Sequence, residues 1–217
     1  MKTFSEFYDL VTPELPGVTT DMLDYQLRQV ARDFCEKTSC WRLPFDDVAL
    51  VASQATYDLE ASEPQSAVVR VVSLTIGTEL LWQSDEPRSD PHRSHCHVVK
   101  LKYDRTMPPF TLSPDLLEIT LVTNEVPTVA LAAGLHVIGA MKPSINATAL
   151  PDFLLSQYSE AMRFGTLSRL MVMAKKPWTD RALASVYAFE WSKAVNFSAY
   201  QAQVGNTRAP LRVRKWG

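Results

Sequence analysis

The stretch TDRALASVYAFEWSKAVNFSAYQAQVG, residues 179–205, carries the strongest structural signal in the chain. Its length predicts one helix of about 40 Å at 1.5 Å per residue, starting near Asp180 and ended by Gly205. Apolar residues cover more than half of its circumference, which is more than a protein of this size readily encloses. The pattern predicts either a central core helix or a helix that also forms a subunit interface. The aromatic residues expected at such an interface are Tyr187, Phe189, Trp191 and Tyr200.

Besides a short segment at residues 4–11, which stops before Pro13, two longer regions have the apolar spacing of helices. A helix capped by Thr19 or Thr20 is predicted to end near Thr38. Its apolar stripe consists of Leu23, Leu27, Val30 and Phe34. Residues 151–176 predict a second helical region that is interrupted at Gly165.

Between these regions, residues 45–143 are rich in Val, Thr and Tyr and have the spacing of β-strands. The segments predicted to be strands are 48–59, 68–76, 79–83, 97–103, 116–123 and 129–138. Residues 84–94 contain almost no apolar side chain and predict an exposed loop. This region is therefore expected to form a β-rich unit of about five or six strands.

The expected fold class is α+β. A helical bundle core, built from an N-terminal helix and two C-terminal helices, would carry a β-rich insertion and an extended C-terminal arm. The expected divisions are residues 1–44 for the N-terminal helical part of the core, 45–143 for the insertion, 144–205 for the C-terminal helical core and 206–217 for a docking arm.

The composition limits the class of protein. Of the 217 residues, 46% are hydrophobic and 21% are charged, and these fractions exclude a disordered chain. The longest nearly apolar run, Val126 to Ala140, is too short to span a bilayer, so no membrane association is expected. Three cysteines, Cys35, Cys40 and Cys96, favour packed thiols in a reducing compartment over a disulfide framework.

Charge is distributed unevenly along the chain, although its formal total is only −2. Residues 1–63 hold 12 acids and 5 bases, residues 64–162 hold 10 acids and 7 bases, and residues 163–217 hold 2 acids and 10 bases. The net charges of the three segments are thus −7, −3 and +8. Three explanations remain open: a basic tail for nucleic acid, complementary surfaces of neighbouring subunits, or pairing within one folded chain.

No catalytic motif stands out in the sequence. It has no Gly-x-Ser-x-Gly elbow and no glycine-rich phosphate loop, so we expect neither an enzyme nor a cofactor. The one metal-like cluster consists of His92, His95 and His97, with Cys96 among them. On a strand, His95 and His97 would share a face and could bind one zinc ion, which leaves a metal-dependent hydrolase as the least favoured alternative. His136 lies in an apolar run and is expected in the core.

The C-terminal arm alternates basic and apolar residues. Those expected to contact a partner are Arg208, Leu211, Arg212, Val213, Arg214, Lys215 and Trp216. In an extended conformation, the arginines at 212 and 214 point to one side and the apolar residues next to them point to the other. This pattern is typical of a strand that adds to the sheet of another chain. A frayed basic tail and a nucleic-acid contact are the alternatives.

Several short segments of the chain occur in the same order as in a family of known proteins. They are Leu150–Leu154, Tyr158–Ala161, Gly165–Leu167, Lys176–Asp180 and Leu211–Arg214, with Trp41, Leu50–Ala52, Tyr57–Leu59 and Val68–Val71 upstream. In this order the chain resembles the head-to-tail adaptor (connector) proteins of tailed bacteriophages, over most of its length.

The resemblance implies a structural protein of the virion neck, assembled in the host cytoplasm. It implies a homo-oligomeric ring, commonly of twelve copies, beneath the portal protein. The C-terminal arm would reach the portal, and the opposite side of the ring would receive a nozzle or tube protein of the tail. Double-stranded DNA would pass through the lumen without specific binding. The alternatives are a tail-tube or nozzle subunit and a nucleic-acid-binding protein that uses the basic arm.

Overall fold

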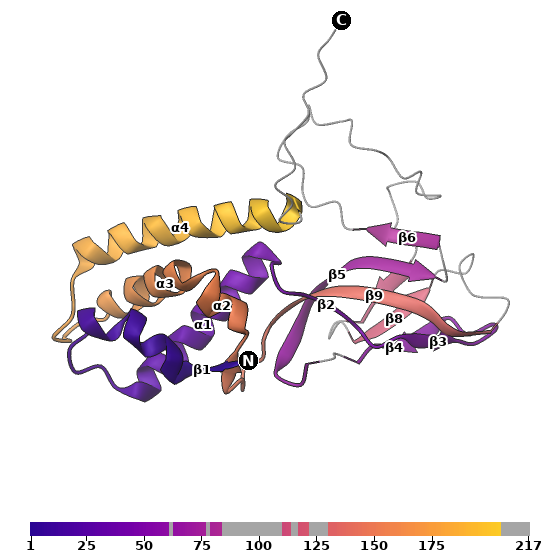
Figure 1. Ribbon diagram of the computed structural model, residues 1–217, viewed down its shortest axis with the longest axis horizontal. Helices are drawn as coiled ribbons and strands as arrows, with labels where there is room; N and C mark the ends of the chain where they lie inside the picture. The colour runs from indigo at the N-terminus through magenta and orange to yellow at the C-terminus, as the bar shows by residue number, and fades with distance from the viewer. Residues whose placement is uncertain (61–62, 77–78, 84–109, 114–116, 122–129, 205–217) are drawn as a thin grey trace, which may run out of the picture.

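The structure, a computed structural model, describes residues 1–60, 63–76, 79–83, 110–113, 117–121 and 130–204. The protein contains both α-helices and antiparallel β-sheets. The molecule is elongated, with the helices at one end and the two larger sheets at the other (Figure 1). The predicted strand at 97–103, the predicted loop at 84–94, the histidine cluster and the arm from residue 206 onward lie outside the described residues.

The helices are η1 (Phe4–Leu10) and η2 (Thr12–Glu14), both of the 3-10 type, and α1 (Thr20–Thr38), α2 (Asp152–Ser156), α3 (Ser159–Met171) and α4 (Arg181–Val204). The predicted bounds of α1 are confirmed, since Thr19 is its N-cap residue and Thr38 its last residue. All four residues of the predicted α1 stripe are buried. The prediction of one long C-terminal helix is confirmed by α4.

The predicted interruption at Gly165 is wrong, because α3 continues through this residue. A Cβ atom on Gly165 would lie 2.5 Å from Cγ1 of Val30 on α1 and 2.7 Å from Nε1 of Trp191 on α4. The glycine therefore allows three helices to approach one another closely. The helical region at 151–176 is interrupted earlier, between α2 and α3.

The strands are β1 (Lys2–Thr3), β2 (Arg42–Pro44), β3 (Val48–Leu50), β4 (Thr56–Asp58), β5 (Ser66–Ile76), β6 (Glu79–Gln83), β7 (Phe110–Leu112), β8 (Glu118–Leu121), β9 (Leu131–Pro143) and β10 (Ala149–Leu150). In the largest sheet, β2 and β3 pair with one edge of β9 and β5 pairs with the other, with β6 beyond β5. A second sheet has the order β4-β8-β7, and β1 pairs with β10. Four predicted strands are confirmed as β5, β6, β8 and β9, although β9 continues five residues beyond its predicted end at 138.

The single strand predicted for residues 48–59 is wrong. This segment forms β3 and β4, which belong to different sheets. Between them the chain turns at Ser53, whose φ is 65°, without a glycine or proline that would indicate a turn. The Tyr57 hydroxyl donates a hydrogen bond to the carbonyl of Gln54 at 2.9 Å and so holds the turn against β4.

The hydrophobic core extends from the helical end into the sheets. Its larger cluster contains the fully buried Leu27 and Phe34 of α1 together with residues of β5, β8 and β9. Phe45 covers Gly139 of β9 so closely that a Cβ atom there would lie 2.6 Å from the phenyl ring. A smaller cluster contains Leu23, the residues Val11 and Leu15 on either side of η2, and residues of α3 and α4. Helix α1 contributes to both clusters and thereby links them.

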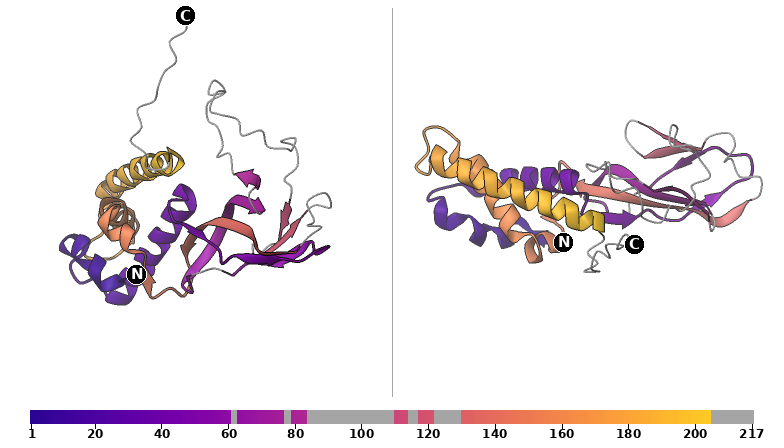
Figure 2. Two further views of the ribbon diagram at one scale, coloured as in Figure 1. Left: turned by 45° about the vertical axis from the view of Figure 1, so that its right-hand side comes forward. Right: turned by 90° about the horizontal axis from the view of Figure 1, so that it is seen from above.

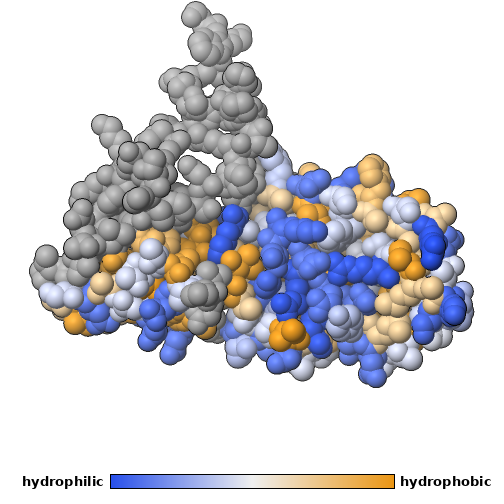
Figure 3. All heavy atoms as spheres, turned by 180° about the vertical axis from the view of Figure 1, so that it is seen from behind, coloured by the Kyte–Doolittle hydropathy of each residue, from blue (hydrophilic) through white to orange (hydrophobic). Residues whose placement is uncertain are grey.

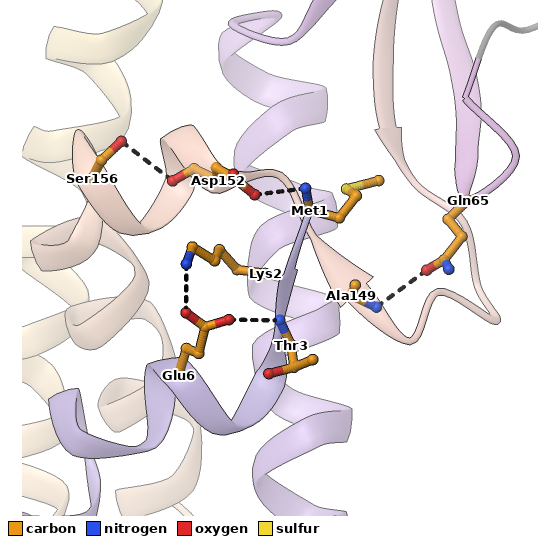
Figure 4. A network of polar contacts seen from close by, with 8 residues as sticks. All are labelled: Met1, Lys2, Thr3, Glu6, Gln65, Ala149, Asp152 and Ser156. Atoms are coloured by element: carbon orange, nitrogen blue, oxygen red, sulfur yellow. Dashed lines mark hydrogen bonds and ion pairs between the residues drawn. The ribbon is translucent and has the colours of Figure 1, made fainter.

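A network of polar contacts fastens the helices to the sheets (Figure 4). The side-chain oxygen of Gln65 accepts the backbone N–H groups of Thr148 at 2.9 Å and Ala149 at 3.1 Å. The strand pair β1 and β10 lies next to this contact. The amino group of Met1 pairs with the carboxylate of Asp152 on α2 at 2.6 Å. The first residues of the chain are thus tied to the connection between β9 and α2 (Figures 1 and 4).

Ion pairs join the acidic first segment of the chain to the basic last segment. Arg163 pairs with Glu14, and Arg169 pairs with Asp33. Part of the charge gradient is therefore neutralised inside one chain, as one of the three explanations requires. The pairs join η2 and α1 to α3, so they also fix how the helices pack.

Candidate subunit interface on helix α4

Helix α4 begins at a turn that sets its direction. The carboxylate of Asp180 accepts the N–H of Leu183 at 2.9 Å, which satisfies a free donor of the first helical turn. The N–H of Asp180 donates to the carbonyl of Met171 at the end of α3 at 3.1 Å. As a result α4 runs back along α3 and also contacts α1 (Figures 1 and 2).

One side of α4, the inner face, packs against the rest of the chain. Its residues are Ala184, Tyr187, Trp191, Val195, Ser198 and Ala202. The small residues among them are buried, and the two aromatic residues are half-buried. The spacing of three, four, four, three and four residues is that of one helix face.

The structure places Tyr187, one of the predicted interface residues, in contacts within the chain. Its hydroxyl donates a hydrogen bond to the Glu14 carboxylate, which also pairs with Arg163. Its ring stacks on Phe164, with centroids 5.8 Å apart and planes inclined by 20°. The hydrogen bond to Glu14, and secondly burial, raise the pKa of Tyr187 above its ordinary value of 10.0.

Trp191 also has its neighbours within the chain. The ammonium group of Lys37 on α1 lies 4.5 Å from its ring centroid, and the guanidinium carbon of Arg169 on α3 lies 5.7 Å away. Both distances are typical of cation–π contacts. Arg169 is itself oriented by its pair with Asp33. Trp191 therefore joins α4 to both α1 and α3.

The opposite side of α4 carries large apolar residues that face solvent. The exposed stripe consists of Val186, Phe189, Phe197 and Tyr200, whose exposed fractions are 54%, 61%, 62% and 45%. At 100° per residue, these positions lie on the side of the helix away from the inner face. In Figure 3, apolar residues lie among polar ones along the upper edge of the helical end, where α4 runs.

A pair of charged residues divides the exposed stripe into two halves. The Lys193 ammonium lies 4.6 Å from the centroid of the Phe189 ring and 2.7 Å from the Glu190 carboxylate. Lys193 stands four residues after Phe189 and four before Phe197. The two apolar halves are thus separated by one ion pair on the same helix.

Of the four residues predicted at an interface, two lie on the exposed stripe, Phe189 and Tyr200. It adds Val186 and Phe197, which the prediction did not include. Their regular spacing from Phe189 and Tyr200 was available in the sequence. A helix that is apolar on most sides does not, however, indicate which side faces its own chain.

Other predicted residues lie elsewhere. The arm residues Arg208, Leu211, Arg212, Val213, Arg214, Lys215 and Trp216 are outside the described part of the chain. The prediction of a core position for His136 is wrong. Its Nδ1 lies 2.6 Å from Oδ1 of Asp47, and both side chains are partly exposed. A histidine paired in this way is a surface residue of β9.

Within the described residues, no three His, Cys, Asp or Glu side chains lie close enough together to hold a metal ion. In the same part of the chain, every helix is too short or too polar to cross a bilayer. The arrangement that stands out is therefore the exposed stripe.

Comparison with known proteins finds no family model that matches the chain and no curated protein that is similar to it.

Proposed function

We propose that this protein is a non-enzymatic structural subunit of the bacteriophage virion neck, a head-to-tail adaptor that forms a ring under the portal. The observation that carries the proposal is the exposed stripe on α4, on the side of the helix away from its own core. In this proposal α1, α3 and α4 form a helical bundle core, residues 45–143 a β-rich insertion and residues 206–217 an extended arm. The stripe is the contact between neighbouring subunits.

A ring requires a heterologous contact, in which the stripe of one copy meets a different surface of the next copy. Covering the four half-exposed side chains would contribute roughly 1 kcal/mol each, or about 4 kcal/mol in all. Association of two proteins costs at least about 4 kcal/mol in lost translational and rotational freedom. The stripe alone is therefore too small to drive assembly, and we expect the ring to form on the portal as a template.

The arm supplies the contact with the portal in this proposal. It follows α4 directly, so the ring contact and the portal contact are consecutive along the chain. Its 12 residues could reach roughly 40 Å if extended. Its alternation of basic and apolar residues suits addition to a strand edge of the portal. The tail protein would bind the opposite side of the ring, and double-stranded DNA would pass through a lumen lined by acidic residues.

Electron microscopy of the full chain mixed with its portal protein tests the proposal. The expected result is a second ring stacked on the portal ring. A chain that stays monomeric and does not bind the portal would contradict the adaptor function. A ring that forms without binding the portal would favour the tail-tube or nozzle alternative.

Substitution of the stripe tests its role in the ring. The double variant Phe189→Ser, Phe197→Ser should lose ring formation, because the two most exposed side chains of the stripe are removed. Ile145→Ser is the matched control, since Ile145 is also exposed (64%) but belongs to the connection between β9 and β10 instead of to α4. Circular dichroism of each variant checks that the fold is kept. Rings that persist in the double variant would exclude the stripe as the contact.

Deletion of residues 208–217 tests the arm separately. The shortened chain should fold but fail to attach to the portal. Unchanged attachment would remove the arm from the proposal while leaving the stripe in it. Retardation of duplex DNA in a gel, sensitive to salt, would instead favour the nucleic-acid-binding alternative.

A further inference from the structure

Strand β4 lies at an edge of the three-stranded sheet β4-β8-β7. In its ladder with β8, the N–H of Leu59 donates to the carbonyl of Leu117 at 2.6 Å. Because backbone groups point alternately to the two sides of a strand, those of Thr56 and Asp58 point away from β8. The outward groups of an edge strand are a template to which another strand can add.

Most of these outward groups have no partner within the described residues. The carbonyl of Thr56 accepts a side-chain N–H of Gln54 at 2.7 Å. The N–H of Thr56 and both backbone groups of Asp58 make no hydrogen bond in the part of the chain that the structure describes. A side-chain amide thus takes the place of one strand N–H on this edge, and three further positions are open to an added strand.

The two faces of the β4–β8 pair differ. Tyr57 and Ile119 point inward and are buried. On the outer face Asp58 stands directly opposite Glu118, and both are exposed. They form a non-hydrogen-bonded pair of the antiparallel ladder, in which opposite side chains are closest. The two carboxylates repel each other, and neither is paired with a cation within the described residues.

The C-terminal arm has the complementary pattern. It contains no acid and four basic residues, Arg208, Arg212, Arg214 and Lys215. On an extended chain Arg212 and Arg214 share one side, and Val213 points to the other. When Val213 stands opposite Tyr57, one of the two arginines stands opposite Asp58, whichever direction the added strand has. Apolar and charged residues of the arm would therefore meet their like and their opposite, respectively, on the two faces of β4.

We propose that the chain's own C-terminal arm adds to β4 as a fourth strand of this sheet. The added strand would begin after Pro210, which has no N–H to donate. Helix α4 runs from the far end of the helices toward the sheets, so the arm starts on the side where the sheets lie (Figure 1). The connecting residues 205–210 span up to roughly 20 Å when extended.

The contact between the arm and β4 does not depend on the adaptor function, because it forms without a portal. In the proposed adaptor, the portal would displace the arm from β4 when it binds. A failure of the contact with β4 would leave the contact with the portal intact. The test therefore uses the full chain alone.

Hydrogen exchange of the full chain, followed by mass spectrometry of its peptides, measures the contact. Amides of residues 211–215 should exchange more slowly in the parent than in the double variant Asp58→Lys, Glu118→Lys, because the variant repels the arginines. The expected difference is at least about fivefold, since exposed ion pairs are individually weak. In the parent, high salt should speed the exchange of the same amides.

Asp9→Lys is the matched control. Asp9 is also an exposed acid, but it belongs to η1 at the helical end. This variant should leave exchange in the arm unchanged. In a third variant, Arg212→Glu and Arg214→Glu are added to the two lysine substitutions. Slow exchange should then return, because the charges of the arm and the sheet are again opposite.

The contact is overturned if residues 211–215 exchange equally fast in the parent and the double variant, or if exchanging the charges does not restore slow exchange. Slow exchange that depends on protein concentration would assign the site to the arm of a second copy and overturn the assignment to the chain's own arm. Residues 211–215 that exchange in the parent as fast as an unfolded peptide would also overturn it, even where a variant fails to fold.

Discussion

The two sides of α4 carry aromatic residues in different surroundings. On the inner face, Tyr187 and Trp191 each contact charged groups from other helices, such as Glu14 and Lys37. On the exposed stripe, Phe189 contacts Lys193 of its own helix. Both sides carry apolar residues, but within the described part of the chain Tyr187 and Trp191 have polar partners on other helices, whereas Phe189 has its charged partner on α4 itself. The comparison shows that partners from elsewhere in the chain, more than hydrophobicity, identify the face that a helix turns inward.

The largest effect on stability is expected from a substitution that forces the inner face of α4 away from α1 and α3. Gly165→Val should lower the free energy of unfolding by about 3 kcal/mol, because its side chain would overlap Val30 and Trp191. Ala188→Val, at an exposed position of α4, is the matched control and should change it by less than about 0.5 kcal/mol. Urea unfolding followed by circular dichroism measures both. Equal effects would show that α4 does not pack on Gly165.

A smaller effect is expected from enlarging a residue of the inner face itself. Ala184→Leu should cost about 2 kcal/mol, since Ala184 is buried in the smaller core cluster. Ala182→Leu makes the same change on the exposed side and should be nearly neutral. Two equally stable variants would contradict the assignment of inner and outer faces, and a larger loss in Ala182→Leu would reverse it.

The surroundings of Tyr187 predict a dependence on pH. Because its pKa in the folded chain is raised above 10.0, the neutral phenol contributes stability that is fully present below pH 10.0. This contribution is lost as the pH rises through the higher pKa of the folded state. Tyr187→Phe should therefore be less stable at neutral pH and should lose less stability above pH 10.0. Unfolding curves across this range measure it, and Glu14→Gln should lower the pKa of Tyr187 in an absorbance titration.

The smallest effect on stability is expected at the exposed stripe. Phe197→Ser should change the free energy of unfolding of the isolated chain by less than about 0.5 kcal/mol, because this side chain is 62% exposed. Urea unfolding of the monomer measures it. A loss of several kcal/mol would mean that Phe197 already packs within its own chain, and the contrast between the two sides of α4 would disappear.

The sequence predicted the features that local residues determine. The bounds of α1 were predicted from its regular stripe and from Thr19, which is the N-cap residue although its side chain makes no capping hydrogen bond, and the length of α4 follows from an uninterrupted helical pattern. Of the three errors, the core position predicted for His136 overlooked its pairing with Asp47, and the other two have non-local or unusual causes. Gly165 is explained by Val30 and Trp191, which are distant in sequence. The turn at Ser53 uses a left-handed serine, a conformation with little sequence signal.

The exposed stripe could be predicted only in part. The sequence shows that α4 has too many apolar residues for one contact face, and it includes Phe189 and Tyr200 among the interface candidates. It does not show that the Tyr187 hydroxyl donates a hydrogen bond to Glu14, which lies 173 residues earlier in the sequence. Such long-range polar contacts decide how α4 is rotated about its axis, and no periodicity within the helix specifies them.

Strand β9 has a mechanical consequence. It is bonded along both edges, to β2 and β3 on one side and β5 on the other, and it runs along the long axis of the molecule (Figure 1). A force that pulls the helical end away from the sheet end therefore loads these hydrogen bonds in shear. Bonds loaded in shear must break together, whereas a strand peeled from an edge loses them one by one. The molecule should thus resist stretching along its length much better than sideways opening.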